Sequence, residues 1–163
     1  MCENAPQSNQ GEGGVFVASL IKTGGFTWCS GTLVNKQYVV TAAHCTYNKK
    51  IEQLRIGLSE YNLTDITYGQ LVVGVCTDTI EHPDWTGEVR DGNDIALVKL
   101  CKPIIYTETL SPVCLPSIQS QGTELENLPA MVSGWGRTSE GGSLSTLLME
   151  VEVQEGGGGV RAP

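Results

Sequence analysis

The sequence lacks features that would mark several classes of protein. No stretch approaches the roughly 18 consecutive apolar residues of a transmembrane helix. Only 10 Lys and Arg stand against 18 Asp and Glu, giving a formal net charge of −8. A chain this acidic has neither the basic footprint of a nucleic-acid-binding protein nor the basic cluster that favours an anionic membrane. We therefore expect no nucleic-acid partner and no membrane association.

Helical periodicity is nearly absent as well. Short runs of β-branched and aromatic residues alternate with turn residues instead, which predicts strands. The expected strands are 15–21, 31–34, 38–41, 54–58, 70–79, 95–100 and 130–134, with one helical turn at 42–47. Many short strands separated by frequent turns predict an all-β sandwich or barrel. At 163 residues, the chain is long enough to bury a real core.

None of the six cysteines lies in a Cys-x-x-Cys pair, which weakens zinc-ribbon and thioredoxin-type interpretations. Disulfides are then the better interpretation, and they imply an oxidising compartment. The first residues, Met1 to Gln7, have neither the basic segment nor the apolar segment of a signal peptide. We expect that a secreted form of this protein would have lost its natural start here.

Two motifs carry candidate chemistry. The run from Cys29 to Cys45 ends in Thr-Ala-Ala-His-Cys, and the run from Asn93 to Leu100 begins Asn-Asp-Ile-Ala-Leu. They resemble the histidine and aspartate segments of trypsin-like serine proteases. Ser133 to Arg137, which contains Gly-Trp-Gly and follows the segment 112–116, resembles the opening of that family's second barrel. Finer details look most like invertebrate clip-domain-type proteases.

The resemblance assigns roles to the two candidate residues. His44 would be the general base and acid, and Asp94 would orient the imidazole and stabilise the imidazolium. Asp91 is a competing carboxylate, but it precedes the wrong context. Metal ligation by Cys45, His44 and His82 is the rival interpretation, and it lacks ligand spacing. The family needs no metal or organic cofactor, so we expect none.

The nucleophile segment of the family does not occur in these 163 residues, because no Gly-Asp-Ser-Gly-Gly is present. Ser139 and Ser143 lie near glycines but not in a nucleophile-like turn. We expect a truncated serine endopeptidase domain that lacks the nucleophilic serine and is inactive alone. The alternative is a non-catalytic protease homologue that acts as a binding or regulatory protein. In the full-length form, the resemblance implies a protein or peptide substrate or a protease inhibitor as partner.

The resemblance also implies cysteine pairings and an extracellular location. Cys29 and Cys45 would pair across the histidine segment, Cys76 and Cys101 across neighbouring strands, and Cys2 and Cys114 would tie a leader to the domain. Six cysteines allow many other connectivities. Asn62-Leu63-Thr64 is an acceptor triplet for N-glycosylation.

The fold implied by the resemblance is the all-β Greek-key β-barrel of the trypsin-like fold, with a complete first barrel and a partial second barrel. We expect a leader remnant at 1–13, the first barrel at 14–110, a crossover at 111–127 and the start of the second barrel at 128–154. The Gly-rich end, 155–163, matches nothing in the family, and residues 156–163 have the composition of a linker.

Overall fold

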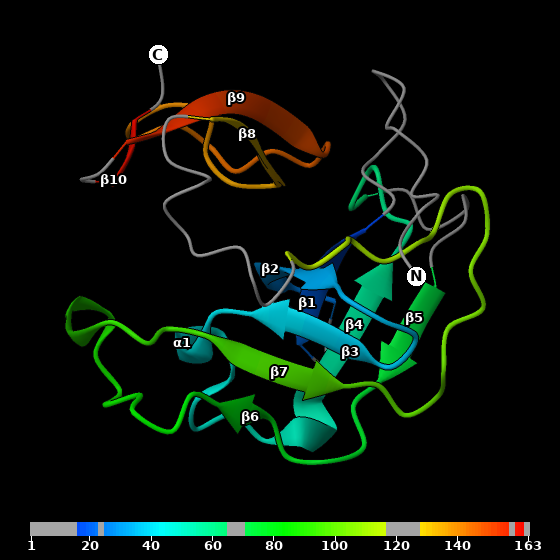
Figure 1. The fold of residues 1–163 in the computed structure, drawn as a ribbon. Coiled ribbons are helices and arrows are strands. Elements are labelled where there is room, and N and C mark those ends of the chain that lie inside the picture. Colours follow the sequence, from blue (N-terminus) through cyan, green and yellow to red (C-terminus); the bar gives the residue numbers. More distant parts are fainter. Residues whose placement is uncertain (1–15, 23–24, 65–70, 117–127, 157–158, 162–163) are drawn as a thin grey trace. The chain divides into compact units, whose positions relative to one another are not determined.

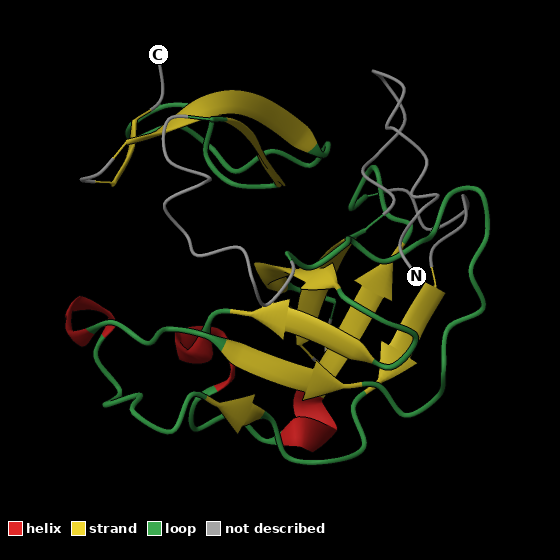
Figure 2. Ribbon diagram, viewed as in Figure 1, coloured by secondary structure: helices red, strands yellow, loops and turns green. Residues whose placement is uncertain are grey.

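A computed structural model describes residues 16–22, 25–64, 71–116, 128–156 and 159–161. Its contacts divide the chain into two compact units, Met1–Cys114 and Leu115–Pro163. Both consist of strands, with short helical turns in the first unit (Figures 1 and 2). No helix in the described part of the chain is long and apolar enough to cross a bilayer.

The first unit is built on one antiparallel sheet of seven strands in the order β5-β4-β1-β2-β3-β7-β6. The strands are β1 Val17–Lys22, β2 Thr27–Leu33, β3 Tyr38–Thr41, β4 Leu54–Leu58, β5 Leu71–Gly74, β6 Ile80–Glu81 and β7 Ala96–Lys99. Single helical turns are α1 Ala43–Thr46, η1 Ile51–Gln53 and η2 Val89–Asp91.

The sheet curls so that the end of β5, at one edge of the sheet, meets the end of β7, which lies next to the other edge. Val75, which follows β5, pairs with Leu100, which follows β7. The backbone N–H of Cys101 donates to the carbonyl of Gly74 at 2.8 Å. Six strands therefore enclose a common interior in the order β1-β2-β3-β7-β5-β4, as a Greek-key barrel requires. The prediction of an all-β, barrel-type fold is confirmed.

The core of this unit follows from alternation along the strands. In β7, Ala96 and Val98 are buried whereas Leu97 and Lys99 are only half-buried, as expected when successive side chains point to opposite faces. The residues that fill the barrel are mostly aliphatic: Ala18, Leu20, Leu33, Val39, Leu54, Ile56, Leu58, Val73, Val75, Val98, Leu100, Ile104 and Leu110. Cys45 belongs to the same cluster, so the turn that bears His44 is fixed directly to the core.

The second unit is a three-stranded antiparallel sheet in the order β10-β9-β8. Its strands are β8 Pro129–Gly134, β9 Met149–Gly156 and β10 Gly159–Arg161. Val132 pairs with Val151, which gives the β8–β9 pair an apolar cross-strand contact position.

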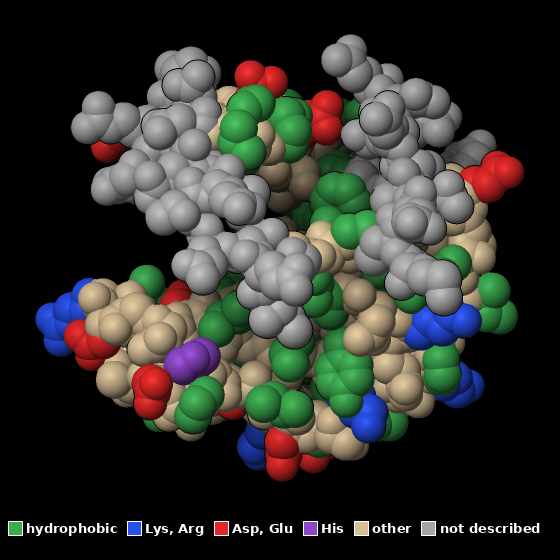
Figure 3. Space-filling view, viewed as in Figure 1, with side chains coloured by type: hydrophobic (Ala, Val, Ile, Leu, Met, Phe, Trp, Pro, Cys, Tyr) green, Lys and Arg blue, Asp and Glu red, His purple; other side chains and the backbone are tan. Residues whose placement is uncertain are grey.

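On the face of the described residues shown in Figure 3, Lys and Arg side chains lie scattered and form no continuous basic patch.

The observed strands depart from the expected ones in several places. Of the expected strand 70–79, the structure shows only β5, Leu71–Gly74, and β9, Met149–Gly156, is not among the strands expected above. β2 begins at Thr27 rather than Gly31, because pairing with β1 extends it through Trp28 and Cys29. β6 has only two residues, too few for a period-2 pattern to reveal it. Part of the expected linker, Gly159–Arg161, instead pairs with β9.

Candidate active site

His44 lies on α1, a single turn directly after β3. Ala42 is extended, and the backbone N–H of Cys45 donates to its carbonyl at 3.1 Å to start the turn. Ala43 is fully buried, so its small side chain lets the turn lie against the barrel. The His44 side chain remains half exposed. The sequence thus places a solvent-accessible imidazole on a rigid support.

Asp94 is brought to His44 by strand register. β3 pairs with β7 so that Thr41 lies opposite Ala96. Thr41 lies just before the His44 turn, and Ala96 follows Asp94 closely. The pairing of Thr41 with Ala96 therefore brings His44 and Asp94 together, although they are 50 residues apart in the sequence. β3 and β7 lie side by side with α1 near one end (Figure 1). Asn93, at φ 56°, turns the chain just before Asp94.

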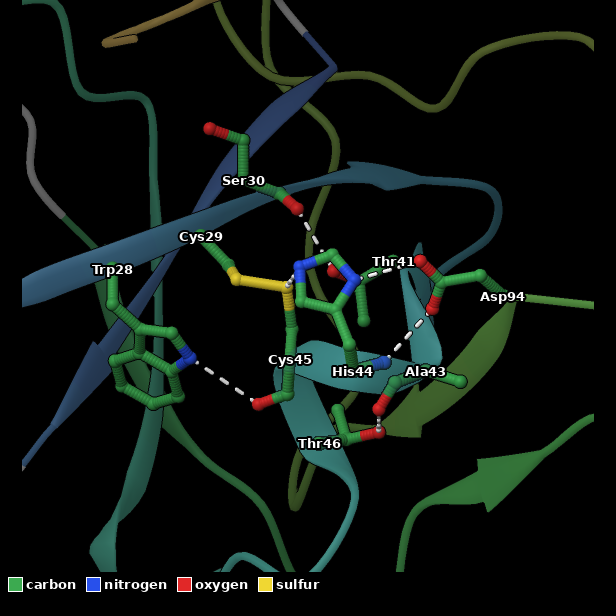
Figure 4. A network of polar contacts seen from close by, with 9 residues as sticks. All are labelled: Trp28, Cys29, Ser30, Thr41, Ala43, His44, Cys45, Thr46 and Asp94. Carbon is green, nitrogen blue, oxygen red and sulfur yellow. Dashed lines mark hydrogen bonds and ion pairs between the residues drawn. A yellow bond between two sulfur atoms is a disulfide. The ribbon is translucent and has the colours of Figure 1, made fainter. Parts of the chain in front are cut away.

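The Asp94 carboxylate holds His44 at two points. Its Oδ2 lies 2.7 Å from His44 Nδ1, and its Oδ1 accepts the backbone N–H of His44 at 2.8 Å (Figure 4). An ionised carboxylate can only accept hydrogen bonds, so Nδ1 carries the proton and donates it. Nε2 is then the ring nitrogen left for chemistry, and both the tautomer and the orientation of the ring are set.

The environment of Asp94 lowers its pKa below the ordinary value. Burial raises this pKa. Four interactions lower it and together outweigh burial: the hydrogen bond from the His44 backbone, the hydrogen bond from the His44 ring, the charge of that ring and a backbone hydrogen bond from Ala43. The carboxylate is therefore ionised at neutral pH. It can hold the imidazole and stabilise a positive charge on it.

This lowered pKa predicts a specific acid sensitivity. A carboxylate whose pKa is lower in the folded than in the unfolded chain stabilises the fold above about pH 4, and this contribution is lost as the pH falls through the folded pKa. Asp94→Asn should lower the free energy of unfolding by about 1 kcal/mol at pH 6. The difference from the unmodified chain should disappear toward pH 2.

Denaturant unfolding at pH 2 to 6 tests this prediction, with Asp84→Asn as the control. The Asp84 side chain is 79% exposed and should contribute little at any pH. A difference between the Asp94 variant and the unmodified chain that is independent of pH would contradict the role given to the ionised carboxylate.

A disulfide joins the His44 turn to β2. Cys29 and Cys45 are bonded, with 6.2 Å between their Cα atoms, and they close a loop of 16 residues. The indole N–H of Trp28 donates to the carbonyl of Cys45 at 3.2 Å. His44 Nε2 lies 3.4 Å from Cys45 Sγ (Figure 4). The turn is therefore fixed by a covalent bond, by core packing and by hydrogen bonds.

The same sulfur atoms bear on the metal interpretation. A His44 ring nitrogen and the Sγ atoms of Cys29 and Cys45 all lie within 4.8 Å of one another. The two sulfurs are bonded to each other, however, and a disulfide sulfur carries no thiolate charge with which to bind a metal. Nδ1 of His82, the third residue of the metal interpretation, accepts the backbone N–H of Asp84 at 3.1 Å.

Sequence reasoning missed a pair of hydrogen bonds beneath the site. Thr46, almost fully buried at the end of α1, lies with its hydroxyl 2.8 Å from Glu81 Oε1. The hydroxyl of Thr79 donates to the same oxygen at 2.6 Å. Glu81 lies on β6, which pairs with β7 at Ala96, close to Asp94. Only the tertiary pairing shows this link, since neither Thr46 nor Glu81 belongs to a motif.

The other residues singled out in the sequence have hydrogen-bond partners other than His44 and Asp94. Asp91 accepts the hydroxyl of Thr86 at 2.8 Å and lies on η2. Asn62 accepts both the backbone N–H and the hydroxyl of Thr64, at 3.0 Å and 2.7 Å, within the acceptor triplet. Ser139, in the second unit, accepts the backbone N–H of Gly142 at its carbonyl, at 3.0 Å.

The other two expected cysteine pairs have different outcomes. Cys76 and Cys101 form a disulfide that links the segments after β5 and β7, where the barrel closes. Cys2 lies outside the described residues, and Cys114 is exposed at the end of the first unit.

Comparison with known proteins agrees with the geometry. The model of the family described as Trypsin matches residues 5–156. The chain is 37% identical over 127 residues to the Drosophila melanogaster protein "Serine proteinase stubble" and 38% identical over 119 residues to "Trypsin II-P29" of Gallus gallus. It is also 37% identical over 114 residues to "Ovochymase" of Halocynthia roretzi. The chain belongs to the trypsin family, and its domain is that of a trypsin-like serine protease.

The matched regions differ in their share of each chain. They cover 77%, 72% and 69% of this chain for the stubble, trypsin and ovochymase proteins, respectively. They span 16%, 44% and 7% of those relatives. The chain therefore spans less than half the length of each of these curated relatives.

Proposed function

We propose that this chain is part of a serine endopeptidase in which His44 is the general base and acid. The observation that carries the proposal is the two-point contact of Asp94 with the ring and backbone of His44. With Nδ1 held by the carboxylate, Nε2 takes the proton of an attacking serine hydroxyl and later gives it to the leaving amine. Asp94 stabilises the imidazolium that forms between these steps.

The proposal assigns no nucleophile to residues 1–163. Ser139 and Ser143 belong to the second unit, and neither lies in a Gly-Asp-Ser-Gly-Gly sequence. Without a nucleophile and its oxyanion hole, covalent catalysis and its main electrostatic stabilisation are both missing. We therefore propose that residues 1–163 alone do not hydrolyse peptides. Protein or peptide substrates and inhibitors belong to the full-length form, which we place in the extracellular space because both disulfides need an oxidising compartment.

Serine-directed labelling tests this proposal. Purified 1–163 should show no labelling by a fluorophosphonate probe and no hydrolysis of peptide amides above the buffer rate, whereas an active trypsin in parallel should show both. Stoichiometric labelling of one serine that His44→Ala abolishes would keep the role of His44 but overturn the absence of a nucleophile. Labelling unaffected by His44→Ala would overturn both.

The alternative is a non-catalytic homologue that binds a partner through the first barrel. The presence of both His44 and Asp94 in productive contact favours the endopeptidase, because a binding protein has no chemical need for that pair. Full-length transcript sequencing separates the two, since only the endopeptidase requires a serine nucleophile to be encoded downstream.

A further inference from the structure

The second ring nitrogen of His44 faces a disulfide. Nδ1 is held by Asp94, and Nε2 lies 3.4 Å from Cys45 Sγ, within the range of a hydrogen bond to sulfur (Figure 4). When His44 is protonated, Nε2–H donates toward that sulfur. An acid placed beside one sulfur of a disulfide is positioned to protonate it as a leaving group, which speeds thiol–disulfide exchange.

The two sulfurs of this disulfide are not equivalent. Cys45 is buried in the barrel core with 3% of its surface exposed, whereas Cys29 on β2 is only partly buried. An incoming thiolate therefore reaches Cys29 more readily than Cys45. Attack on Cys29 expels Cys45, and Cys45 is the sulfur that His44 contacts. Exposure and hydrogen bonding thus select the same direction of reaction.

We propose that Cys29–Cys45 is a thiol-exchange site in which His44 acts as the acid for the leaving Cys45 sulfur. The co-reactant is a small thiol. Its thiolate forms a bond to Cys29 Sγ, the Cys29–Cys45 bond breaks, and the electron pair of that bond leaves on Cys45 Sγ. The Nε2 proton of His44 passes to this sulfur. A second thiolate then attacks the small-thiol sulfur of the mixed disulfide, releasing Cys29 as a thiolate and an oxidised small-molecule disulfide.

The charges around the turn favour this step. Asp94 precedes β7 and contacts the ring, while Glu81 of β6 contacts Thr46 on the same turn. Both are carboxylates, and the strands β2 and β3 carry no Asp, Glu, Lys or Arg. The imidazolium is the form that can donate from Nε2, and these neighbours bring two carboxylates and no positive charge to the turn. The inference uses no peptide cleavage, so it stands or falls independently of the endopeptidase proposal.

The other disulfide of the described chain serves as an internal control. Cys76 is exposed, so Cys76–Cys101 should be the faster to react if accessibility alone decides. The backbone N–H of His82, the only other histidine, donates to the carbonyl of Ile95 just before β7, whereas Cys101 follows the end of that strand. This disulfide thus lies at the other end of β7 from both His82 and the His44–Asp94 pair.

The experiment measures how fast reduced glutathione opens each disulfide in the intact 1–163 chain between pH 5.5 and 8.5. Samples are quenched with acid, digested with pepsin and mapped by mass spectrometry. The rate for Cys29–Cys45 divided by the rate for Cys76–Cys101 cancels the change in glutathione thiolate with pH. We expect this ratio to be about tenfold higher at the acid end. We also expect the first glutathione adduct on Cys29 rather than Cys45.

His44→Ala should flatten the ratio across the pH range and leave the Cys76–Cys101 rate unchanged. His82→Ala is the matched control and should leave the ratio as in the unmodified chain. Circular dichroism before reduction checks that each variant is folded. A ratio that is flat in the unmodified chain, a ratio unchanged by His44→Ala, or a first adduct on Cys45 would overturn the proposal. If the His44 variant fails to fold, the adduct position and the pH profile of the unmodified chain still decide.

Discussion

Replacing Leu20 by alanine is expected to lower the free energy of unfolding of the first unit by about 3 kcal/mol. Leu20 is fully buried in β1, where it lies opposite Cys29 of β2 and Ile56 of β4. Shortening its side chain leaves a cavity at the junction of three strands, and the paired backbones restrict the collapse that would refill it. Denaturant unfolding followed by tryptophan fluorescence measures the effect, because Trp28 packs against this core.

Leu71→Ala makes the same chemical change at an exposed position of the same sheet. Leu71 is on β5 and 41% exposed, so it loses less burial and leaves no enclosed cavity. We expect a loss below about 1 kcal/mol for this variant. Equal losses at the two positions would show that the interior of the barrel is not packed as the burial of Leu20 indicates.

Removing the Cys29–Cys45 disulfide is the second change with a large expected effect. Replacing both cysteines by alanine should lower the free energy of unfolding by about 3 kcal/mol, because the loop of 16 residues gains freedom in the unfolded chain. Since Cys45 is a core residue, lost packing adds to this entropic term. Thermal and denaturant unfolding of the double variant under non-reducing conditions measures the loss.

The Cys76–Cys101 pair again supplies the comparison. Its loop is 25 residues, so the entropic model gives a loss of similar size when both cysteines are replaced. The two variants should differ, however, in the environment of the His44 ring. NMR signals of the His44 ring should shift and broaden when Cys29 and Cys45 are removed, and stay in place when Cys76 and Cys101 are removed. A loss under about 1 kcal/mol, or unchanged His44 signals in the first variant, would contradict the anchoring role of this disulfide.

The sequence predicted most of the strands because their residues carry the signal locally. The runs 38–41 and 54–58 match β3 and β4 at both ends, since alternating apolar residues are bounded there by turn residues. β6 and β10 escaped prediction because two or three residues contain no period and owe their conformation to a partner strand. The longer β9, Met149–Gly156, was not among the expected strands either. β2 was predicted too short for the same reason, since pairing with β1 determines where it begins.

By itself the sequence determined the fold class, the family and the candidate residues, because strand periodicity and the motifs around His44 and Asp94 are properties of neighbouring residues. Only the tertiary structure decided what those residues contact. The register of β3 on β7 brings the Asp94 carboxylate onto Nδ1 of His44, and the placement of Cys45 beneath the ring puts a disulfide sulfur beside Nε2. These contacts join residues from different strands and turns, and their distances depend on how the whole sheet closes. No local pattern in the sequence encodes such distances.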